Sequence, residues 1–334
     1  MNDYITLAHG AGGKQTNELI GGIFRKYFEN PYLTADDAAV LPEIKGRIAM
    51  TTDGFIVSPR FFPGGNVGRL AVCGTVNDLA CMGAKPLYMT CSCVIEEGFP
   101  VAELEEIVKS LAETAEEAGV YVVAGDTKVA GKGQVDGIFI TTAGVGEVIE
   151  GTDLSGANAA EGDVILVSGD IGRHGGTILL ARDEYGIEAD LTSDDAPLNH
   201  LMEEMISVTK DIHVIRDATR GGVGTVLYEI ASESNVGVEI ERDCIPVDPA
   251  LQGVCGMLGL EPLYLACEGR FVVIAPERYK DRLLEVMRTG KYSANAACIG
   301  KITSEHQGRV TVTTSIGART LLPPPGGELL PRIC

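Results

Sequence analysis

Apolar and polar residues follow each other along this chain with two different periods, and each period predicts a different kind of element. Over residues 101–118 apolar side chains recur every three or four positions, and Gly119 follows, which predicts an amphipathic helix and its end. Over residues 87–95 and 138–148 the apolar residues form short runs instead, which predict strands. The two patterns recur through the whole chain.

Helices and strands are therefore expected in alternation, an arrangement typical of layered α/β domains. Helices are predicted at residues 14–28, 67–82, 101–118, 177–182, 199–209, 250–258 and 278–288, with one more after residue 222. Strands are predicted at residues 47–52, 87–95, 120–124, 138–148, 164–168, 236–240, 271–275, 297–302 and 310–313. No clear sequence repeat relates the two halves.

The chain is too long for one typical hydrophobic core, since 334 residues favour two domains. The polar, glycine-containing stretch at residues 150–156 is the best candidate for the boundary. We therefore predict a first domain over residues 1–155, a second over 156–320, and a mobile C-terminal tail over 321–334.

Charge excludes several kinds of partner. The formal net charge of -20 argues against anionic membrane surfaces and against nucleic acid, because phosphate backbones are bound by clustered Lys and Arg. No apolar run is long enough to span a membrane, and residues 1–4 do not resemble a secretory signal. Nine cysteines without a compact framework fit a reducing compartment, so we expect a cytoplasmic protein.

Among the cysteines, Cys334 is the one placed for chemistry. It follows a stiff proline segment and a Gly-Gly joint, and at about 3.1 Å per residue the stretch from Pro323 could sweep roughly 35 Å. A frayed end that happens to carry a cysteine is the alternative. Cys91 and Cys93 lack zinc-site spacing and are expected to pack inside a strand. Core positions are also expected for Cys73, Cys81, Cys244, Cys255, Cys267 and Cys298.

Aspartates stand at the ends of several predicted elements of the first domain. Asp53 and Asp126 each directly follow a predicted strand, where open α/β sheets place ligands, and the others are Asp36, Asp37 and Asp78. Any one of them alone could be a turn or N-cap residue. Together they are the hard oxygen ligands that Mg²⁺ prefers, with water and phosphate completing its shell. The glycine loop at residues 9–14 is a weak further sign of anion binding, and a plain turn is an equally good interpretation.

Several longer strings resemble the HypE family of hydrogenase maturation proteins, within a superfamily that includes PurM, selenophosphate synthetase and thiamine-monophosphate kinase. The strings shared with the superfamily are Asp-Asp-Ala-Ala-Val (36–40), Thr-Thr-Asp (51–53), Asn-Asp-Leu-Ala-Cys-Met-Gly-Ala-Lys-Pro (77–86) and Gly-Asp-Thr (125–127). Those typical of HypE are Ala-His-Gly-Ala-Gly-Gly (8–13), Phe-Phe-Pro-Gly-Gly-Asn (61–66), Gly-Asp-Thr-Lys-Val (125–129), Arg-Asp-Ala-Thr-Arg-Gly-Gly-Val (216–223) and the final Pro-Arg-Ile-Cys. The last is the most diagnostic, and it favours a chemical role for Cys334.

The resemblance implies a fold and a reaction. The fold would be a two-domain α/β (α+β) PurM-like one, with first domains pairing into a homodimer around a β-barrel-like sheet and an ATP site between the domains. HypF, a carbamoyltransferase, would load a carbamoyl group onto the sulfur of Cys334. This chain would then use ATP to dehydrate that group to a thiocyanate, which a HypC–HypD complex would receive as a cyanide ligand for iron.

The resemblance also implies roles for individual residues. ATP and Mg²⁺ would bind through Gly12, Gly13, Asp37, Thr52, Asp53, Asn77, Asp78 and Asp126, with Asp37, Asp53, Asp78 and Asp126 on the metal. Cys334 would carry the substrate, Glu268 would be the base that removes N–H protons, and Lys128 would orient the amide or relay protons. The alternative for Glu268 is a turn acid paired with Arg270.

The roles of two arginines are undecided at this point, and two other functions for the protein are possible alternatives. Arg216 and Arg220 could hold phosphate or guide the tail, and an ion pair with Asp217 is the alternative. Another ATP-dependent enzyme of the superfamily, such as a selenophosphate synthetase or thiamine-monophosphate kinase, would leave Cys334 without a role. A scaffold whose cysteine tail docks a partner or a metal would need no turnover at all.

Overall fold

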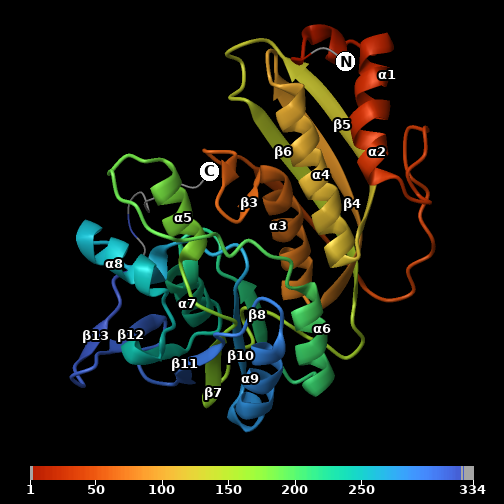
Figure 1. Cartoon of the computed structure of the whole chain (residues 1–334). Coiled ribbons are helices and arrows are strands. Elements are labelled where there is room, and N and C mark those ends of the chain that lie inside the picture. Colours follow the sequence, from red (N-terminus) through yellow and green to blue (C-terminus); the bar gives the residue numbers. More distant parts are fainter. Residues whose placement is uncertain (1–2, 325, 327–334) are drawn as a thin grey trace.

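The computed structural model describes residues 3–324 and 326 and shows two α/β bodies side by side (Figure 1). The first body is built on a four-stranded sheet and the second on a seven-stranded sheet. The chain leaves the first sheet at Val148 and enters the second at Asp163. The expected two-domain α/β fold is thereby confirmed, whereas the exact domain limits stay predictions.

In the first body, α3 and α4 cover one face of the sheet, whose strand order is β1-β6-β4-β5. β4 and β5 are parallel and joined through α4, and the other neighbours are antiparallel. The strands are β1 (Ile48–Phe55), β2 (Phe61–Phe62), β3 (Gly65–Asn66), β4 (Ala84–Glu96), β5 (Tyr121–Ala130) and β6 (Ile138–Val148). The helices are α1 (Lys14–Leu19), α2 (Arg25–Phe28), α3 (Val67–Cys81) and α4 (Val101–Ala118), with the 3₁₀ turn η1 (Leu7–Gly10) and the π turn η2 (Ile20–Phe24).

The helix ends follow from local chemistry. The side-chain oxygen of Asn66 accepts hydrogen bonds from the N–H groups of Gly68 and Arg69, which caps α3. Gly119 takes a left-handed conformation with φ 72° and ends α4, as the sequence predicts. The helix predicted at 14–28 forms as α1 and α2 joined by the π turn of η2, which contains the helix-weakening Gly21 and Gly22.

In the second body, the sheet has the order β13-β12-β9-β11-β7-β10-β8, and hydrophobic clusters lie on both of its faces. The strands are β7 (Asp163–Val167), β8 (Val214–Asp217), β9 (Gly237–Glu241), β10 (Phe271–Pro276), β11 (Ala297–Thr303), β12 (Arg309–Thr313) and β13 (Arg319–Leu321). The helices are α5 (Arg173–Ala181), α6 (Asn199–Val208), α7 (Gly222–Glu233), α8 (Pro249–Leu258) and α9 (Lys280–Thr289), with the 3₁₀ turns η3 (Arg242–Cys244), η4 (Pro262–Tyr264) and η5 (Glu277–Tyr279).

Helix α3 joins the two bodies. It packs on β1 and β6 of the first sheet and also contacts β8 and α6 of the second body, and it runs through the middle of the molecule in Figure 1. Its side chains are buried almost throughout its length. Residues on α3 can therefore reach groups of either body.

The end of the described chain is fixed to the second body. Leu321 ends β13, Leu322 is buried, and the hydroxyls of Tyr228 and Tyr264 donate to the carbonyl oxygens of Leu322 and Pro323. Cys334 lies outside the described residues, as does the rest of the chain from residue 327. Within the described part, no helix is both long and apolar enough to cross a membrane.

Most of the expected core cysteines are buried, including the Cys91 and Cys93 pair inside β4. Cys244 is a correction, because it is exposed in the short turn η3 that follows β9. The three residues of that turn bury no side chain, so an apolar residue there has no core to join.

Candidate functional site between the domains

Asp53 and Asp126 lie inside strands, so the prediction that each directly follows a strand is wrong. β1 continues through Asp53 to Phe55, and β5 continues through Asp126 to Ala130. Both are edge strands, where polar side chains can point to solvent or to a loop without ending the strand. The periodicity of apolar residues stops before the strand does.

Asp53 and Asp78 meet at the boundary between the two bodies. Asp78 projects from α3 and accepts a 2.7 Å hydrogen bond from the hydroxyl of Thr51, which precedes Asp53 by two residues on the same face of β1. Burial and then the charge of Asp78 raise the pKa of Asp53 to about 6, while Arg220 opposes the shift. The two predicted ligands are thus brought together.

Asp217 extends this acidic group from the second body. It ends β8, and burial followed by the charge of Asp78 raises its pKa to about 7. The pKa of Glu268 is raised well above its ordinary value by burial and by the charges of Asp195, Asp217, Asp194 and Asp53, in that order. We call Asp53, Asp78, Asp217 and Glu268 the interdomain acids. A carboxyl group held in this way is suited to accept a proton near neutral pH.

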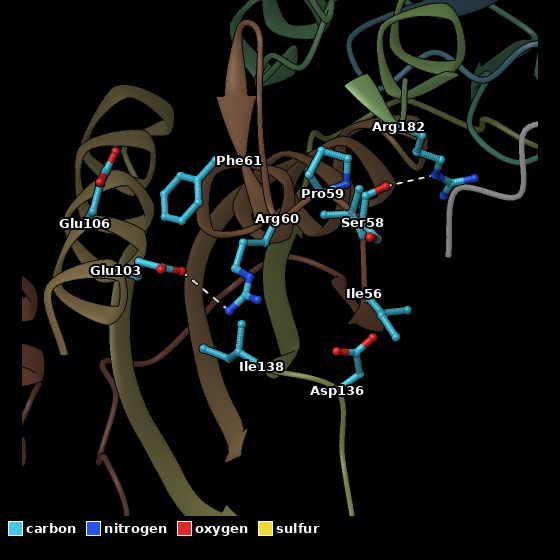
Figure 2. Close-up of a pocket in the computed structure, with 11 residues that line it drawn as sticks. Ile56, Ser58, Pro59, Arg60, Phe61, Glu103, Glu106, Asp136, Ile138 and Arg182 are labelled. Atoms are coloured by element: carbon cyan, nitrogen blue, oxygen red, sulfur yellow. Dashed lines mark hydrogen bonds and ion pairs between the residues drawn. The ribbon is translucent and has the colours of Figure 1, made fainter. Parts of the chain in front are cut away.

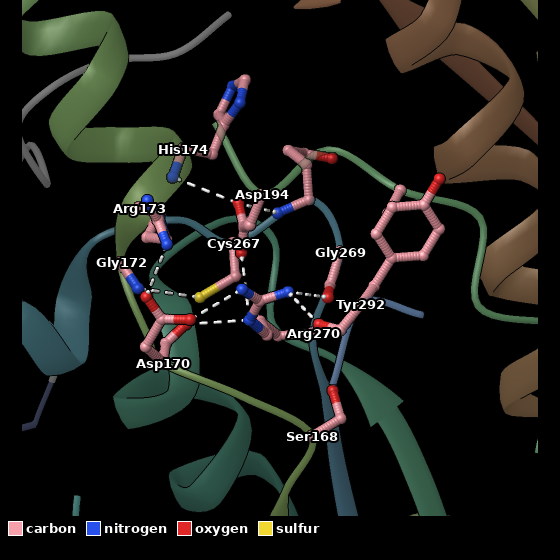
Figure 3. Close-up of polar contacts among 12 residues, drawn as sticks. Ser168, Asp170, Gly172, Arg173, His174, Asp194, Cys267, Gly269, Arg270 and Tyr292 are labelled. Atoms are coloured by element: carbon pink, nitrogen blue, oxygen red, sulfur yellow. Dashed lines mark hydrogen bonds and ion pairs between the residues drawn. The ribbon is translucent and has the colours of Figure 1, made fainter. Parts of the chain in front are cut away.

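Glu268 is not paired with Arg270, which removes the alternative weighed for it. The Arg270 guanidinium is buried and binds Asp170 at 2.8 Å, with Asp194 at 3.7 Å (Figure 3). Glu268 is positioned instead through its backbone. Its N–H donates to the Asp194 carboxylate at 3.2 Å, and its carbonyl oxygen accepts from the side chain of Asn77 at 3.3 Å. Its carboxylate is left available.

Asn77 serves as a link between the domains. Its side-chain N–H groups donate to the carbonyls of Ala196 and Glu268, and its oxygen accepts from the N–H of Leu198 at 2.8 Å. The amide is buried and fully used by these bonds. Its predicted role in binding the cofactor stays a prediction, and its visible role is to hold α3 against the second body.

A second group of predicted residues lines a cavity of about 400 Å³ beside β5. Gly12, Asp37, Asp126 and Lys128 all line it, and Lys128 pairs with Asp126 at 3.1 Å. Gly13 stands at the N-cap of α1 nearby in sequence. We call Asp37, Asp126 and Lys128 the β5-edge group. All three side chains are exposed.

Within a single chain, the interdomain acids and the β5-edge group lie far apart. β1 and β5 are opposite edges of the first sheet, three strand spacings apart, or about 14 Å. Among the residues that the structure describes, no group of three or more His, Cys, Asp or Glu is placed to hold a metal ion. A single metal bound by Asp37, Asp53, Asp78 and Asp126 of the same chain therefore has no support in this geometry.

Asp53 and Asp78 alone still fit a magnesium ion. Mg²⁺ is usually held by one or two carboxylates, with waters and substrate phosphates completing its octahedron. Burial and then repulsion from Asp78 raise the pKa of Asp53, and a bound cation would relieve that repulsion. The donor set is thus suitable for a nucleotide-bound Mg²⁺.

The remaining predicted residues lie outside these two groups and make ordinary contacts. The hydroxyl of Thr52 donates to the carbonyl of Thr142 at 3.0 Å within the sheet. Arg216 forms an ion pair at 2.7 Å, but with Glu229 rather than with Asp217. Arg220 is exposed and contributes to the field at Asp53.

A larger cavity of about 990 Å³ lies elsewhere, between the loop after β1 and the end of α5 (Figure 2). Arg182 donates to the carbonyl of Ser58 at 2.9 Å, and Arg60 faces Glu103 at 3.5 Å. None of the residues predicted for catalysis or cofactor binding lines it. Size alone therefore does not identify the reactive site.

Sequence reasoning missed Asp195 and Asp217 as members of the site. Asp217 lies in the Arg-Asp-Ala-Thr-Arg-Gly-Gly string, where it was considered only as the partner of an ion pair. Asp195 lies in a segment without helix or strand, where its sequence is that of an ordinary polar loop. The sequence feature that could have identified Asp195 is the acidic pair Asp194-Asp195 directly before Ala196 and Pro197. Both acids of this pair are buried in the structure.

Comparisons with known proteins cover the whole chain. Family models named AIR synthase related protein match it twice, the N-terminal domain at residues 35–148 and the C-terminal domain at residues 160–313. The protein named carbamoyl dehydratase HypE from Rhodobacter capsulatus is 44% identical, over 100% of this chain and 99% of the relative. Its namesake from Escherichia coli K12 is 41% identical, over the full length of both.

Solved structures agree with the sequence relatives. A crystal structure of the hydrogenase maturation protein HypE in complex with ATP is 43% identical with a TM-score of 0.94, covering 98% of this chain and 99% of that one. HypE from a HypE–HypF complex is 46% identical with a TM-score of 0.82, covering 92% and 99%. A thiamine-monophosphate kinase at 21% identity and a TM-score of 0.68 shares the fold alone. The chain therefore belongs to the HypE family of hydrogenase maturation proteins.

Proposed function

We propose that this chain uses ATP to dehydrate a carbamoyl group on the sulfur of Cys334 to a thiocyanate, the source of a cyanide ligand for [NiFe] hydrogenase. The observation that carries this function is the placement of Glu268, a free carboxylate with a raised pKa among the interdomain acids. Full-length similarity to proteins named carbamoyl dehydratase supports it. The final Pro-Arg-Ile-Cys string supports Cys334 as the carrier.

The chemistry needs activation of a poor leaving group and removal of protons. The carbamoyl oxygen attacks the γ-phosphorus of ATP, the bond to the β-phosphate breaks and ADP leaves, and Glu268 takes a proton from the carbamoyl nitrogen. After its first proton has moved on, Glu268 takes the second N–H proton as the C–O bond to phosphate breaks, which forms the nitrile. Phosphoryl transfer depends mainly on positioning and charge neutralisation. Lys128 would contribute positive charge at the carbamoyl group.

ATP binding is supported by the ATP complex of a HypE protein with a TM-score of 0.94 to this chain. Asp53 and Asp78 are the residues that would hold Mg²⁺, and the ion would neutralise phosphate charge during transfer. The β5-edge group, with Gly12, offers a second surface for the nucleotide. Asp37 and Asp126 would then contact nucleotide or its metal only if they come from another copy of the chain.

A homodimer would supply that second copy. The first sheet has two edge strands, β1 and β5, that pair with nothing further in the described chain. Ile48 and Met50 on β1 are 60% and 71% exposed, which is unusual for apolar strand residues and leaves a surface for a second sheet. Pairing two such sheets would bury these side chains and would join the β5-edge group of one copy to the interdomain acids of the other.

Mixing two inactive variants tests this shared site. Lys128→Ala and Asp78→Asn affect different groups, so a mixed dimer keeps one intact site if each site draws on both copies. We expect water loss to reappear after the two variants are unfolded and refolded together, and not after either is refolded alone. Mixtures that stay inactive, or a monomer in analytical ultracentrifugation, would contradict the dimeric site.

HypF is the proposed donor of the carbamoyl group, because a HypE from a HypE–HypF complex matches this chain over 92% of its length. The proposed acceptor is a HypC–HypD complex that holds iron, as the family resemblance implies. The chemistry and partners are those of a cytoplasmic protein, which agrees with its cysteine usage.

Intact-mass spectrometry tests the function directly. The protein is incubated with HypF, carbamoyl phosphate and ATP, and then with fresh Mg-ATP. We expect one carbamoyl adduct on Cys334, followed by the loss of one water that requires ATP. An adduct elsewhere, or water loss without ATP, would contradict the proposal, and Cys334→Ala should prevent both steps.

A further inference from the structure

Asp195 is a buried acid that the reaction as described does not use. Its side chain belongs to a residue only 4% exposed, and among the described residues neither carboxylate oxygen has a hydrogen-bond partner of normal geometry, although the Cys73 thiol interacts closely enough to lower its pKa. It lines a cavity of about 490 Å³ together with Arg69, Glu117 and Tyr292. Burying a carboxylate without partners costs free energy, and such groups are concentrated at functional sites.

The segment that carries Asp195 runs directly beside the turn that carries Glu268. The Asp194 carboxylate accepts from the N–H of Glu268, and Asn77 donates to the carbonyls of both Ala196 and Glu268. A Cβ atom on Gly269 would lie 1.9 Å from the carbonyl oxygen of Asp194, so this approach requires glycine. The contacts of Asp194 and Ala196, the two residues that flank Asp195 in the chain, therefore hold Asp195 next to Glu268.

Several charged or titratable groups face Asp195. They are Asp194 in its own segment, Arg69 and Cys73 from α3, Glu117 from α4, and Glu268. Burial raises the pKa of Asp195 to about 7, against the opposing effects of Cys73 and Arg69. Among charges, that of Asp195 is the largest contributor to the raised pKa of Glu268. A carboxyl group with a pKa near 7 can both accept and release a proton at neutral pH.

We propose that Asp195 receives the protons that Glu268 removes from the carbamoyl nitrogen and passes them to water in the 490 Å³ cavity. Two N–H bonds break for each nitrile formed, and the departing phosphate takes up one proton in water, so one net proton is released. Glu268 holds one proton at a time and must pass that proton to another group within each turnover. Asp195 acts through Glu268 and does not touch the carbamoyl group. This inference rests on the proposed function.

Single-turnover kinetics test the relay. The full-length protein is first loaded by HypF and purified, then mixed with Mg-ATP on both sides of pH 7, and water loss is followed by mass. In the wild type the rate should rise with pH through about 7, because Asp195 must be ionised to accept a proton. In Asp195→Asn we expect loading to be unchanged, water loss to be about tenfold to hundredfold slower, and the rise to be lost.

Rescue separates a relay from a structural role. Imidazole added to Asp195→Asn should accelerate water loss in proportion to its concentration, and it should leave the wild type unchanged. Asp195→Glu keeps a carboxyl group and should keep the rise with pH. Lys291→Ala, at the exposed rim of the same cavity, should stay within about twofold of the wild type.

Two results would overturn the relay. One is an Asp195→Asn variant with the wild-type rate. The other is a slow variant that keeps the wild-type pH profile and does not respond to imidazole, which is the behaviour of a residue needed only for folding. Absence of water loss in the wild type would instead overturn the proposed function, and the relay with it.

Discussion

The interdomain acids and the β5-edge group both contain carboxyl groups, yet the structure gives these carboxyl groups different properties. Asp126 and Lys128 are exposed and pair with each other on an edge strand. Asp53, Asp217 and Glu268 are partly buried where α3 meets the second body, and their pKa values are raised, chiefly by burial. Burial between domains, more than the number of acids, therefore determines which group can move protons.

The largest effect is expected at Glu268. In Glu268→Gln the side chain keeps its shape but cannot accept a proton, so water loss from the carbamoylated protein should slow by about 10²- to 10⁴-fold while loading by HypF is unchanged. Single-turnover mass spectrometry measures both steps. Glu261→Gln is a matched control, because Glu261 pairs with Arg242 at 2.7 Å. Equal rates in the two variants would place the base elsewhere.

Asn77→Ala tests what holds the interdomain acids in place. Loss of its three hydrogen bonds leaves the N–H of Leu198 without its partner. The free energy of unfolding in urea should fall by about 1–3 kcal/mol. Asn158→Ala, which removes one exposed bond to Asp153, should cost less than about 1 kcal/mol. If Asn77→Ala leaves the free energy of unfolding unchanged, other contacts are sufficient to hold the interdomain acids in place.

Asp53→Asn tests the repulsion inside the same group. The pKa of Asp53 is raised in the folded protein, so the folded state binds its proton more tightly than the unfolded state. Wild-type stability is therefore lost as pH rises from 3.8, the ordinary pKa of this carboxyl group, through about 6. Without nucleotide, Asp53→Asn should be more stable than wild type by about 1–2 kcal/mol above that window, after allowing for solvent screening.

Urea unfolding at several pH values measures this difference. The gain from Asp53→Asn should shrink towards zero below the window, where the carboxyl is protonated in both states. The same variant should lose stabilisation by Mg-ATP, since one proposed metal ligand is gone. A gain that does not depend on pH would mean that ionisation of Asp53 is not its cause.

The smallest effect on stability is expected at the β5 edge. Asp126 is exposed and paired only with Lys128, so Asp126→Asn should change the free energy of unfolding by less than about 0.5 kcal/mol. Mg-ATP should nevertheless stabilise this variant less than the wild type in thermal unfolding. A large loss of stability without nucleotide would show that the two groups differ less than the structure indicates.

Several parts of this molecule could be predicted from local sequence. The α4 helix begins and ends where its apolar spacing and Gly119 indicate, and the strongly apolar β7 and β10 are close to their predicted ranges. β8 was missed, because Val214–Asp217 is short and merges with a string that reads as the start of a helix. β1 and β5 run past their predicted ends, because an edge strand continues through polar residues that give no periodic signal.

The residues that form the site could be predicted from the sequence more easily than their arrangement in space. Motif resemblance identified Asp53, Asp78 and Glu268, but their proximity depends on α3 packing between two sheets, which no local pattern encodes. Separation of Asp126 from Asp53 follows from the strand order, which places their strands at opposite edges. Asp195 was missed because its burial is a tertiary property of a segment without regular structure.

A crystal structure of the carbamoylated protein with a non-hydrolysable ATP analogue and Mg²⁺ would show directly whether Glu268 reaches the carbamoyl group. We expect the carbamoyl nitrogen within hydrogen-bond distance of the Glu268 carboxylate, with the γ-phosphate and metal on the side of Asp53 and Asp78. A well-ordered carbamoyl group bound elsewhere, with Glu268 contacting neither substrate nor nucleotide, would contradict it.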